Sequence, residues 1–585
     1  MSVAAVEAAP RRGGGTILRS PVPLAAYSRC VGDWLEHWAR AAPERTFLAE
    51  RAGDGMRRLG YRQARHAVRA VGQALLDLGA APDRPVMLLS DNAIDHAIVQ
   101  LAAMHVGVPA APVSPAYSLV SRDHRKLRDI ADVLRPSVVY ASDGALFAPA
   151  FAALDRDVPL LVSRRPSGGQ LLLGDLLKTS PGARGDAAFA ALGPDTVAKV
   201  LFTSGSTGAP KGVVNTQRML CSNQQTTVQS WPFIAERPPI LVDWLPWSHT
   251  FGGNYTFDLV LRNGGTMHVD TGKPMPGRIE ESVRNLREIA PTLYFNVPRG
   301  FDAILPFLER DEPLRRNFFS RLDLLMYAAA GLPANLWTRL ERIAFDAQGR
   351  KIPFVSGWGM TETAPLATLV YFPIERAGVI GLPPPGSELA LVPSSEKLEM
   401  RVKGPNVTPG YWEPGGRVRP LELDAEGFFG TGDAGRLEDP NDPRKGVVFD
   451  GRTAENFKLT SGTWVSVGAL RIAVIAACAP LMQDAVVAGH DRDEITLLVF
   501  LGPGSSPRDP SVRAKIIEGL CAHNAACGAN STRVARAVLL EEPPNIDAGE
   551  ITDKGYINQR AVLTHRATLV ERLYGPAHAD VLVIS

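Results

Sequence analysis

The sequence predicts an α/β protein with a large N-terminal domain of layered α/β subdomains, a β-rich subdomain and a small α+β C-terminal domain. Apolar runs of strand length alternate with amphipathic helical patterns through most of the chain, which is typical of parallel sheets covered by helices. From about Gly378 the pattern changes to short strands separated by Gly and Pro, as in GLPPPGSELALV, which indicates the β-rich part. After about Gly451 the chain returns to mixed helical and strand patterns.

The individual elements follow from the spacing of the apolar residues. Residues 1–20 are expected to form a mobile arm, and helical patterns follow around 31–41 and in LGYRQARHAVRAVGQALLDLG, where Val68, Val71, Leu75 and Leu78 recur at helical spacing. RPVMLLS predicts a buried strand, and the helix after it is expected at 94–106. Further strand-like runs lie at 136–140, 159–162, 197–202, 266–269, 292–297 and 322–328.

The composition excludes several classes of function. Lys and Arg number 63 against 61 Asp and Glu, a net charge of +2, which argues against a broad nucleic-acid surface. No apolar run approaches the ~20 residues that span a bilayer, and MSVAAVEAAPRRGGG does not have the charge order of a secretory signal. Five scattered cysteines do not suggest a disulfide framework, and Cys521, His523 and Cys527 do not have zinc-site spacing. We therefore expect a cytoplasmic protein without a nucleic-acid partner or a membrane span.

A segment rich in glycines and hydroxyls, TSGSTGAPKGV, follows the buried-strand pattern of residues 197–202. Glycines allow backbone N–H groups to turn toward an anion, hydroxyls add donors, and a lysine adds a charge suited to polyphosphate. The segment is not a Walker A loop, because Pro210 precedes Lys211 and Gly212 follows it. A flexible surface loop is the alternative interpretation. The candidate phosphate-binding residues are Thr203, Ser204, Gly205, Ser206, Thr207, Gly208 and Lys211.

This segment resembles the phosphate-loop signature of the adenylate-forming superfamily, which comprises acyl-CoA synthetases, adenylation domains of peptide synthetases and luciferases. Other segments resemble the remaining motifs of the family in the same order and cover most of the chain: LPWSHTFGGN, AAAGLP, GWGMTET, GPNVTPGYW, FFGTGDAGRLED, FDGRTAENFK and GEITDK. Together with the change of pattern near Gly451, the resemblance implies a flexible arm at 1–20, an AMP-binding domain at 21–450, a hinge at 451–455 and a mobile C-terminal domain at 456–585.

The resemblance also implies the groups that handle ATP. Thr361 would contact phosphate and Glu362 would hold Mg²⁺, a hard cation that one or two carboxylates usually bind together with substrate phosphates. Asp433 would accept the ribose hydroxyls and Arg452 would contact ribose or phosphate. Residues beside the nucleotide would be Ala330, Gly331, Trp358, Gly359 and Met360.

The resemblance also implies residues for the acyl pocket, for CoA and for the catalytic lysine. His249 would lie between the acyl pocket and the phosphate loop. Lys458 and Gly462 would lie near the site of thiol transfer to CoA. Lys554 in GEITDK would be the catalytic lysine.

Some positions depart from the family pattern. The hinge residue is usually Asp or Lys, and here it is Ala454 with Glu455 next to it. Glu550 follows Gly549 where an ungapped comparison expects the lysine, so we place that role on Lys554. Trp464 and Arg471 replace residues that are usually polar and acidic. GPNVTPGYW is expected to be structural.

The implied reaction is the activation of a carboxylate by ATP, followed by transfer of the acyl group to CoA. Attack of the carboxylate on the α-phosphorus of ATP gives an acyl-adenylate. AMP leaves the acyl carbon of this adenylate much more readily than an oxide ion would leave a free carboxylate. Lys211, the loop N–H groups and Mg²⁺ on Glu362 would spread the charge of pyrophosphate, and Lys554 would lie between the carboxylate and the α-phosphate. Such chemistry depends on positioning and electrostatics, so no covalent protein nucleophile is expected.

Two longer segments, ENFKLTSGTWVSVGALR and GEITDKGYINQRAVL, resemble feruloyl-CoA synthetases more than the wider family. A hydroxycinnamate such as ferulate is therefore the implied acid. Small glycines beside aromatic residues would admit a flat ring, and Asn254 or Tyr294 would pair with a ring hydroxyl. The implied pocket comprises His249, Phe251, Gly252, Gly253, Asn254, Tyr294 and Trp358.

Other functions stay open from the sequence alone. They are a medium- or long-chain fatty acyl-CoA synthetase, an enzyme that loads a carrier protein, a non-catalytic nucleotide-binding protein and a luciferase-like oxygenase. The sequence leaves room for a homodimer and does not decide the oligomeric state.

Overall fold

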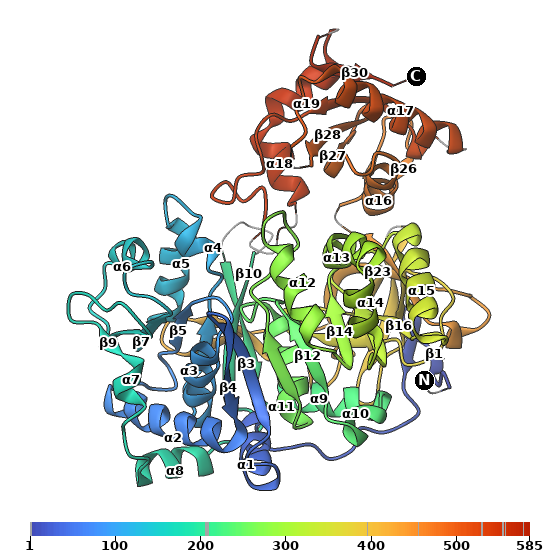
Figure 1. Ribbon diagram of the computed structural model, residues 1–585. Coiled ribbons are helices and arrows are strands. Elements are labelled where there is room, and N and C mark those ends of the chain that lie inside the picture. Colours follow the sequence, from blue (N-terminus) through green and yellow to red (C-terminus); the bar gives the residue numbers. More distant parts are fainter. Residues whose placement is uncertain are drawn as a thin grey trace. The chain divides into compact units, whose positions relative to one another are not determined.

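The computed structural model describes residues 3–204, 210–394, 396–453, 455–502, 504–527, 530–552, 555, 557–576 and 578–584 (Figure 1). Contacts divide the chain into two compact units. Unit 1 comprises residues 1–390, 401–430 and 437–448, and unit 2 comprises residues 391–400, 431–436 and 449–585. The α/β class predicted from the sequence is confirmed.

A nine-stranded sheet in unit 1 carries the candidate phosphate loop. Its strand order is β22-β21-β11-β10-β6-β5-β7-β8-β9. The strands from β10 to β9 run parallel, and β11, β21 and β22 continue the sheet in antiparallel pairs. Short runs such as VMLL and VVYA are fully buried, as expected for parallel strands covered on both faces. The strands are β5 (Val86–Leu89), β6 (Ala110–Pro112), β7 (Val138–Ala141), β8 (Leu160–Val162), β9 (Leu171–Leu172), β10 (Val197–Ser204), β11 (Pro210–Thr216), β21 (Gly410–Glu413) and β22 (Arg417–Pro420).

Two four-stranded sheets complete the α/β part of unit 1. One has the order β12-β13-β3-β4 and the other β14-β15-β16-β17. Because β14, β15 and β16 are parallel, the loops at their carboxyl ends meet at one edge of the sheet, where ligands bind in open α/β sheets. The strands are β3 (Thr46–Ala52), β4 (Gly55–Gly60), β12 (Ile240–Asp243), β13 (Thr266–Val269), β14 (Leu293–Asn296), β15 (Leu324–Tyr327), β16 (Phe354–Gly359) and β17 (Leu366–Leu369).

The helices of unit 1 connect these strands. They are α1 (Val31–Ala41), α2 (Tyr61–Asp77), α3 (Ile94–His105), α4 (Ala116–Leu119), α5 (Arg125–Leu134), α6 (Ala148–Leu154), α7 (Leu173–Leu176), α8 (Ala183–Ala190), α9 (Gln217–Ser230), α10 (Phe233–Glu236), α11 (Phe257–Arg262), α12 (Ile279–Glu288), α13 (Pro298–Arg310), α14 (Glu312–Phe319) and α15 (Ala334–Gln348). A π-helical turn, η1 (Phe251–Thr256), precedes α11, and short 3₁₀ turns occur at η2 (Thr361–Thr363) and η3 (Pro443–Lys445).

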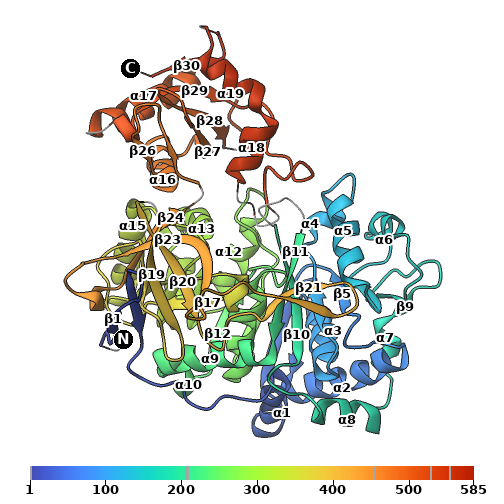
Figure 2. The same cartoon turned by 180° about the vertical axis from the view of Figure 1, so that it is seen from behind.

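The β-rich part forms a seven-stranded sheet with the order β1-β2-β19-β20-β23-β24-β18 (Figure 2). Its strands are β1 (Glu7–Pro10), β2 (Thr16–Arg19), β18 (Val379–Gly381), β19 (Glu388–Ser394), β20 (Lys397–Lys403), β23 (Phe429–Leu437) and β24 (Val447–Arg452).

The described part of the predicted arm, residues 1–20, contains two paired strands. Glu7–Pro10 and Thr16–Arg19 pair as an antiparallel hairpin. The turn between them contains Gly13 and its two following glycines, all with positive φ, which glycine adopts without strain. Arg11 in this hairpin lies 2.7 Å from both Asp424 and Glu426.

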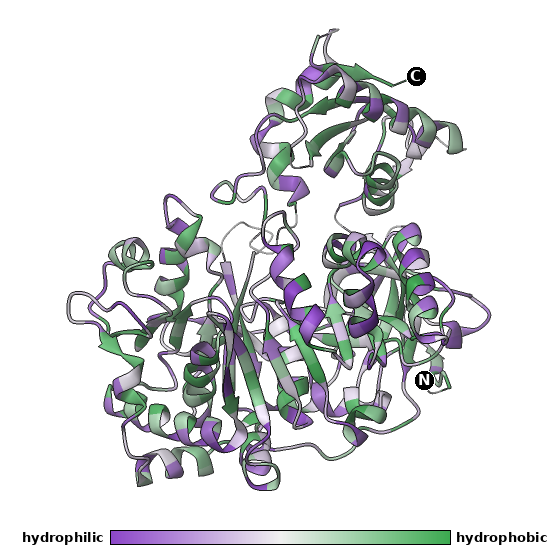
Figure 3. Cartoon of the chain, viewed as in Figure 1, coloured by the Kyte–Doolittle hydropathy of each residue, from purple (hydrophilic) through white to green (hydrophobic). Residues whose placement is uncertain are grey.

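Unit 2 contains its own four-stranded sheet, with the order β27-β28-β29-β30. Side chains alternate along β28 between two cores, with Leu497 and Val499 in one and Leu498 and Phe500 in the other. Figure 3 colours these strands largely green, for hydrophobic residues. The elements are β25 (Phe457–Lys458), β26 (Trp464–Val465), α16 (Val467–Ala477), β27 (Met482–Ala488), β28 (Ile495–Leu501), α17 (Pro510–Ala526), η4 (Asn530–Thr532), β29 (Val534–Leu539), α18 (Gln559–His565), α19 (Ala567–Tyr574) and β30 (Val581–Val583).

No helix within the described ranges has the length and apolar character needed to cross a membrane.

Candidate active site

The candidate phosphate loop connects the two strands of a β-hairpin, β10 and β11. The strands are antiparallel, and Thr203 pairs with Lys211. Lys211 therefore lies on the returning strand, where the hairpin register fixes its backbone opposite Thr203. Ser204 pairs with Pro210 at the end of the ladder. Four of the predicted phosphate-binding residues lie outside the described residues: Gly205, Ser206, Thr207 and Gly208.

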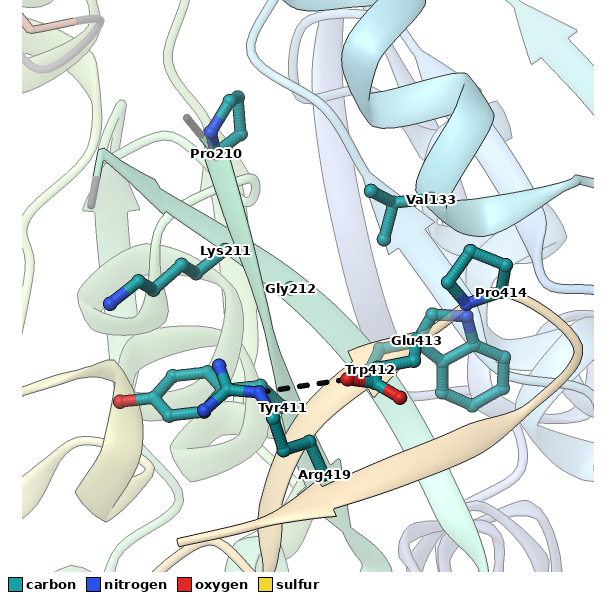
Figure 4. A pocket seen from close by; sticks show the side chains of 9 residues that line it. All are labelled: Val133, Pro210, Lys211, Gly212, Tyr411, Trp412, Glu413, Pro414 and Arg419. Atoms are coloured by element: carbon teal, nitrogen blue, oxygen red, sulfur yellow. Dashed lines mark ion pairs between the residues drawn. The ribbon is translucent and has the colours of Figure 1, made fainter. Parts of the chain in front are cut away.

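The side chain of Lys211 extends over a tyrosine on the neighbouring strand. Its Nζ lies 5.6 Å from the centroid of the Tyr411 ring, and the guanidinium of Arg419 on β22 lies 5.0 Å from the same centroid. A cation over an aromatic face is attracted by the negative charge density of the ring. The three residues line one cavity of about 200 Å³, and Arg419 also pairs with Glu413 at 3.6 Å (Figure 4).

The same tyrosine contacts the predicted magnesium ligand. Thr361 and Glu362 lie in η2, after β16, and both are buried. The Tyr411 hydroxyl donates a hydrogen bond to Oε1 of Glu362 at 3.2 Å. Burial and the adjacent carboxylate raise the pKa of Tyr411, so the phenol stays protonated and keeps its donor. The structure thus brings two predicted site residues, Lys211 and Glu362, to one tyrosine.

The backbone around Glu362 is held by buried amides. Asn223 on α9 and Asn406 both donate from Nδ2 to the carbonyl oxygens of Thr363 and Leu366, at 2.7–3.3 Å. Gly359 is required by packing, because a Cβ at this position would lie 1.7 Å from the carbonyl oxygen of Pro365.

A threonine of the GPNVTPGYW segment joins this turn to the phosphate hairpin. The backbone N–H of Thr408 donates to the carbonyl oxygen of Glu362 at 2.8 Å, and its hydroxyl donates to the carbonyl oxygen of Val214 on β11 at 2.6 Å. This segment, which is expected to be structural, therefore connects two motifs that are far apart in the sequence.

The residues predicted to lie beside the nucleotide are at the carboxyl ends of adjacent parallel strands. Ala330 and Gly331 follow β15 and are exposed, whereas Gly359, the last residue of β16, and Met360 after it are half-buried. Trp358 is the penultimate residue of β16, pairs with Thr368 on β17 and is 8% exposed.

The predicted acyl-pocket segment forms the π-helical turn η1. His249, just before it, is half-buried, and its Nδ1 accepts a hydrogen bond from the backbone N–H of Phe251 at 3.2 Å. Phe251 is buried in the main core, with its ring centroid 6.1 Å from that of Tyr255.

The two glycines of this segment are required by backbone packing. A Cβ on Gly252 would lie 2.3 Å from the carbonyl oxygen of Leu245, and one on Gly253 would lie 2.2 Å from that of Trp247. The missing side chains therefore allow η1 to pack on the backbone of residues 245–247. On that side they leave no space for a substrate ring.

The Asn254 side chain is also buried and forms hydrogen bonds inside the protein. Its Nδ2 donates to Oδ1 of Asn215 at 2.7 Å and to Oγ1 of Thr250 at 3.1 Å, and the side chain is 1% exposed. Since both amide hydrogens are used, this geometry does not support the predicted pairing of Asn254 with a ring hydroxyl.

Tyr294 on β14 lies among aromatic core residues. Its ring packs edge-on against Phe301 and Phe318, and its hydroxyl accepts a hydrogen bond from Asn296 at 3.0 Å. The side chain is 3% exposed, so the structure places it in a core cluster.

Sequence reasoning missed a buried lysine on β10. Lys199 is fully buried, and its Nζ donates to the carbonyl oxygen of Gly253 at 2.6 Å and to Oδ1 of Asn254 at 3.2 Å. Burial lowers the pKa of Lys199, whereas the charge of Asp258 raises it. Burial in turn raises the pKa of Asp258 to about 6, against the opposing effect of Lys199. A lysine inside the apolar run VAKVLF was the signal that could have identified this site.

Unit 2 brings together the two residues predicted for ribose. Nε of Arg452 on β24 lies 3.5 Å from Oδ1 of Asp433 on β23. Thr453 donates two hydrogen bonds to the carbonyl oxygen of Gly432, at 2.9 and 3.0 Å, which fixes the backbone next to Asp433. The Arg452 side chain is 65% exposed and the Asp433 side chain 17% exposed.

The residues predicted for CoA lie on a small hairpin. Lys458 on β25 pairs with Trp464 on β26, and its Nζ lies 5.0 Å from the Trp464 ring centroid. Gly462 occupies the turn with φ +80°, which favours glycine. Arg471, unusual for the family, forms an ion pair with Asp484 at 2.5 Å.

Lys554 and Ala454 lie outside the described residues. Before Lys554, Glu550 is buried, pairs with Arg566 at 2.7 Å and accepts a hydrogen bond from the backbone N–H of Asn545. Ile551 and Ile557, on either side of Lys554 in the chain, form an isolated antiparallel bridge. Glu550 is therefore a structural anchor of this segment.

The oxygen groups of η2 fit a magnesium ion that arrives with a nucleotide. Glu362 offers a carboxylate that is 6% exposed, and Thr361 offers a hydroxyl beside it. Within the described ranges no group of three or more His, Cys, Asp or Glu side chains is placed to hold a metal ion. One carboxylate together with substrate phosphates is the arrangement that Mg²⁺ usually adopts in nucleotide sites.

Comparison with known proteins gives two family matches. The family described as AMP-binding enzyme matches residues 35–412, and the family described as AMP-binding enzyme C-terminal domain matches residues 465–578.

Individual relatives and a solved structure agree with these matches. A long-chain-fatty-acid–CoA ligase of Mycobacterium bovis (strain ATCC BAA-935 / AF2122/97) is 24% identical over 579 residues, covering 88% of this chain and 91% of that protein. A feruloyl-CoA synthase of an Amycolatopsis species is 26% identical over 418 residues, covering 70% of this chain and 76% of that protein. The crystal structure of an anthranilate CoA ligase in complex with anthranoyl-AMP superposes with a TM-score of 0.72 at 21% identity, over 94% of this chain and 99% of that chain, which establishes the shared fold.

Proposed function

Because this chain belongs to the AMP-binding enzyme family, we propose that it is an ATP-dependent carboxylate–CoA ligase that acts on ferulate or a related hydroxycinnamate. The observation that carries the proposal is the contact of both Lys211 and Glu362 with Tyr411 beside the phosphate hairpin. An ammonium group suits the phosphates of a nucleoside triphosphate, and a carboxylate suits its metal ion.

The first step is formation of an acyl-adenylate. A carboxylate oxygen of the acid attacks the α-phosphorus of ATP, and the bond to the bridging oxygen breaks to release pyrophosphate. Lys211 and the backbone of the hairpin stabilise the charge on the departing phosphates, and Lys554 neutralises charge between the carboxylate and the α-phosphate. A Mg²⁺ ion held by Glu362 and Thr361 would neutralise further phosphate charge. Asp433 and Arg452 hold the ribose end of the nucleotide.

The second step transfers the acyl group to the thiol of CoA. The sulfur attacks the carbonyl carbon of the adenylate, the bond to the phosphate oxygen breaks, and AMP leaves. We assign the thiol side of this step to Lys458 and Gly462, and the change between the two steps to movement of a C-terminal domain, residues 456–585, about a hinge at 451–455. Hinged domains commonly gate successive steps in this way.

The aromatic acid is supported by the resemblance of the two C-terminal segments and by the feruloyl-CoA synthase among the relatives. A relative that acts on long-chain fatty acids covers more of the chain, so a fatty acyl-CoA ligase is the main competing assignment. His249 and Phe251, on the turn that precedes α11, are the pocket residues that we retain for either acid.

The experiment is a panel of acids incubated with ATP, Mg²⁺ and CoA, with thioesters identified by HPLC and mass spectrometry and pyrophosphate release measured in parallel. Ferulate, p-coumarate and caffeate are expected to react faster than octanoate or palmitate. Faster turnover of octanoate would overturn the aromatic assignment and leave the ligase assignment standing. If pyrophosphate is released without formation of the CoA thioester, and an added carrier protein is then acylated, the acceptor is a carrier protein and not CoA.

A pair of lysine variants tests the site itself. Lys211→Ala is expected to lower pyrophosphate release by roughly 10²–10³-fold, which is typical for removal of one preorganised group that stabilises transition-state charge. The matched control is Lys178→Ala, an exposed lysine paired with Asp175, which should retain full activity. Equal activity of the two variants would refute the role of Lys211.

A further inference from the structure

Tyr411 occupies the central strand of a three-stranded antiparallel group at one end of the nine-stranded sheet. It pairs with Val213 on β11 and with Arg419 on β22. Lys211 lies two residues before Val213, so its side chain projects from the same face of β11 as that of Val213. Diagonal neighbours on adjacent strands lie within reach of long and aromatic side chains, which explains how Lys211 reaches the Tyr411 ring.

The contacts of Tyr411 divide between its ring and its hydroxyl. The ring receives two cations, Lys211 at 5.6 Å and Arg419 at 5.0 Å, one from each flanking strand. The hydroxyl donates to Oε1 of Glu362 at 3.2 Å. One half-buried side chain therefore contacts groups from three separate segments of the chain.

We infer that Tyr411 is a positioning residue, which fixes the Lys211 ammonium and the Glu362 carboxylate relative to each other before the nucleotide binds. The inference rests on the proposed function, because it assigns Lys211 to phosphate and Glu362 to the metal ion. The sequence alone predicts for Tyr411 only a place in a structural segment.

The physical reason lies in the freedom of the two groups it holds. Lysine carries its charge on a flexible four-carbon stem, so its rotamers must be restricted before it contributes fully to phosphate binding. A hydrogen bond to a metal-binding carboxylate orients that carboxylate, and loss of such partners typically costs 10–100-fold in metal affinity or activity. Tyr411 supplies both restraints, the first through its ring and the second through its hydroxyl.

Arg419 holds the tyrosine from its other neighbouring strand. Its guanidinium pairs with Glu413, and that ion pair fixes it over the Tyr411 ring (Figure 4). The Arg419 side chain is 49% exposed, and we do not assign it to the nucleotide.

Two substitutions separate the effect of the Tyr411 ring from that of its hydroxyl. Tyr411→Phe keeps the ring over which Lys211 lies and removes the hydroxyl that contacts Glu362. Tyr411→Leu removes both. The matched control is Tyr140→Phe, which removes another hydroxyl bonded at 2.8 Å, to Ser163, at a buried site on β7.

The readout is nucleotide binding without any acid or CoA. Binding of Mn²⁺·ATP is followed by electron paramagnetic resonance of Mn²⁺, and binding of metal-free ATP is followed by calorimetry in EDTA. We expect Tyr411→Phe to weaken Mn²⁺·ATP binding by about tenfold and to leave metal-free ATP binding within twofold of wild type. Tyr411→Leu should weaken metal-free ATP binding as well, by about threefold, because Lys211 loses its aromatic platform. Tyr140→Phe should change neither.

The outcomes distinguish this inference from the proposed function. Mn²⁺·ATP affinity in Tyr411→Phe equal to that of the wild type would overturn the inference, and so would an equal loss in Tyr140→Phe, which would indicate general loosening. If the wild type binds Mn²⁺·ATP but makes no thioester from any acid, the ligase assignment fails while the role of Tyr411 is still decided by binding. A wild type that binds no Mn²⁺·ATP would overturn both.

Discussion

At the scale of single residues, Lys199 shows how this protein uses a buried charge to connect two parts of the site. The ammonium lies on the strand that leads into the phosphate hairpin, and it donates to Gly253 and Asn254 of the π-helical turn next to His249. Both carboxylate oxygens of Asp258 are buried and have no hydrogen-bond partner within the described ranges, so Lys199 provides the charge that compensates them. A buried charge is costly unless it is paired.

Removing that ammonium should therefore cost more than the loss of two hydrogen bonds. Lys199→Met is expected to lower the free energy of unfolding by about 3–5 kcal/mol, since it leaves Asp258 buried without its partner charge. Adding Asp258→Asn to the same chain should recover part of the loss. Differential scanning calorimetry of both single variants and the double variant measures this coupling. Additive effects of the two substitutions would contradict the pairing.

A second buried acid should make stability depend on pH. Burial raises the pKa of Asp243 to about 7, although Oδ2 accepts a hydrogen bond from Thr256 at 2.5 Å. The unfolded carboxyl has a pKa of about 3.9, so the folded state binds more protons between about pH 4 and 7, and stability falls as pH rises through that window. Asp243→Asn mimics the neutral acid. The Tm of wild type minus that of Asp243→Asn should therefore decrease from pH 4.5 to 7.5 and level off above it. A difference that is constant or that increases would refute the assignment.

At the scale of elements, the turn after β16 depends on close backbone packing. The added Cβ of Gly359→Ala would collide with the carbonyl oxygen of Pro365, so residues 359–363 must shift and carry Thr361 and Glu362 with them. A misplacement of about 1 Å can cost 10²-fold in rate, and we expect a loss of that order in pyrophosphate release. Gly174→Ala is the control, because open space surrounds its position on α7. Unchanged kinetics in Gly359→Ala would show that the turn adapts.

The elements also show what the sequence could predict. The alternation of apolar runs predicted the α/β class, and the TSGSTGAPKGV and GWGMTET motifs located residues that the structure places near one another. Tyr411, Asn223 and Asn406 were missed as site residues because their partners lie far away in the chain, and local patterns contain no information on such contacts. The packing of Gly252 and Gly253 could not be predicted for the same reason, since the carbonyl groups that require these glycines belong to another segment.

At the scale of the whole molecule, the residues predicted for ATP and CoA fall in both units of the chain. Lys211, His249, Thr361 and Glu362 belong to unit 1, whereas Asp433, Arg452, Lys458 and Gly462 belong to unit 2. The last segment of unit 2 begins at Phe449. The hinge at 451–455 stays a prediction. Under the proposed function, the unit 1 residues act on phosphate and the metal ion, whereas unit 2 supplies the residues for ribose and thiol and, with Lys554, one charge for the α-phosphate.

The role proposed for Lys554 predicts that the two chemical steps can be separated by a single substitution. Lys554→Ala should lower acyl-adenylate formation from ferulate and ATP by roughly 10²–10³-fold, because the carboxylate then approaches the α-phosphate without its charge partner. The same variant should convert chemically prepared feruloyl-adenylate and CoA to the thioester within a fewfold of the wild-type rate, since the proposal gives Lys554 no part in thiol attack. Lys515→Ala, an exposed lysine on α17, is the control for charge removal in the same unit. Adenylation at the wild-type rate would remove Lys554 from the first step. Equal loss of both steps would contradict a role of Lys554 that is confined to the first step.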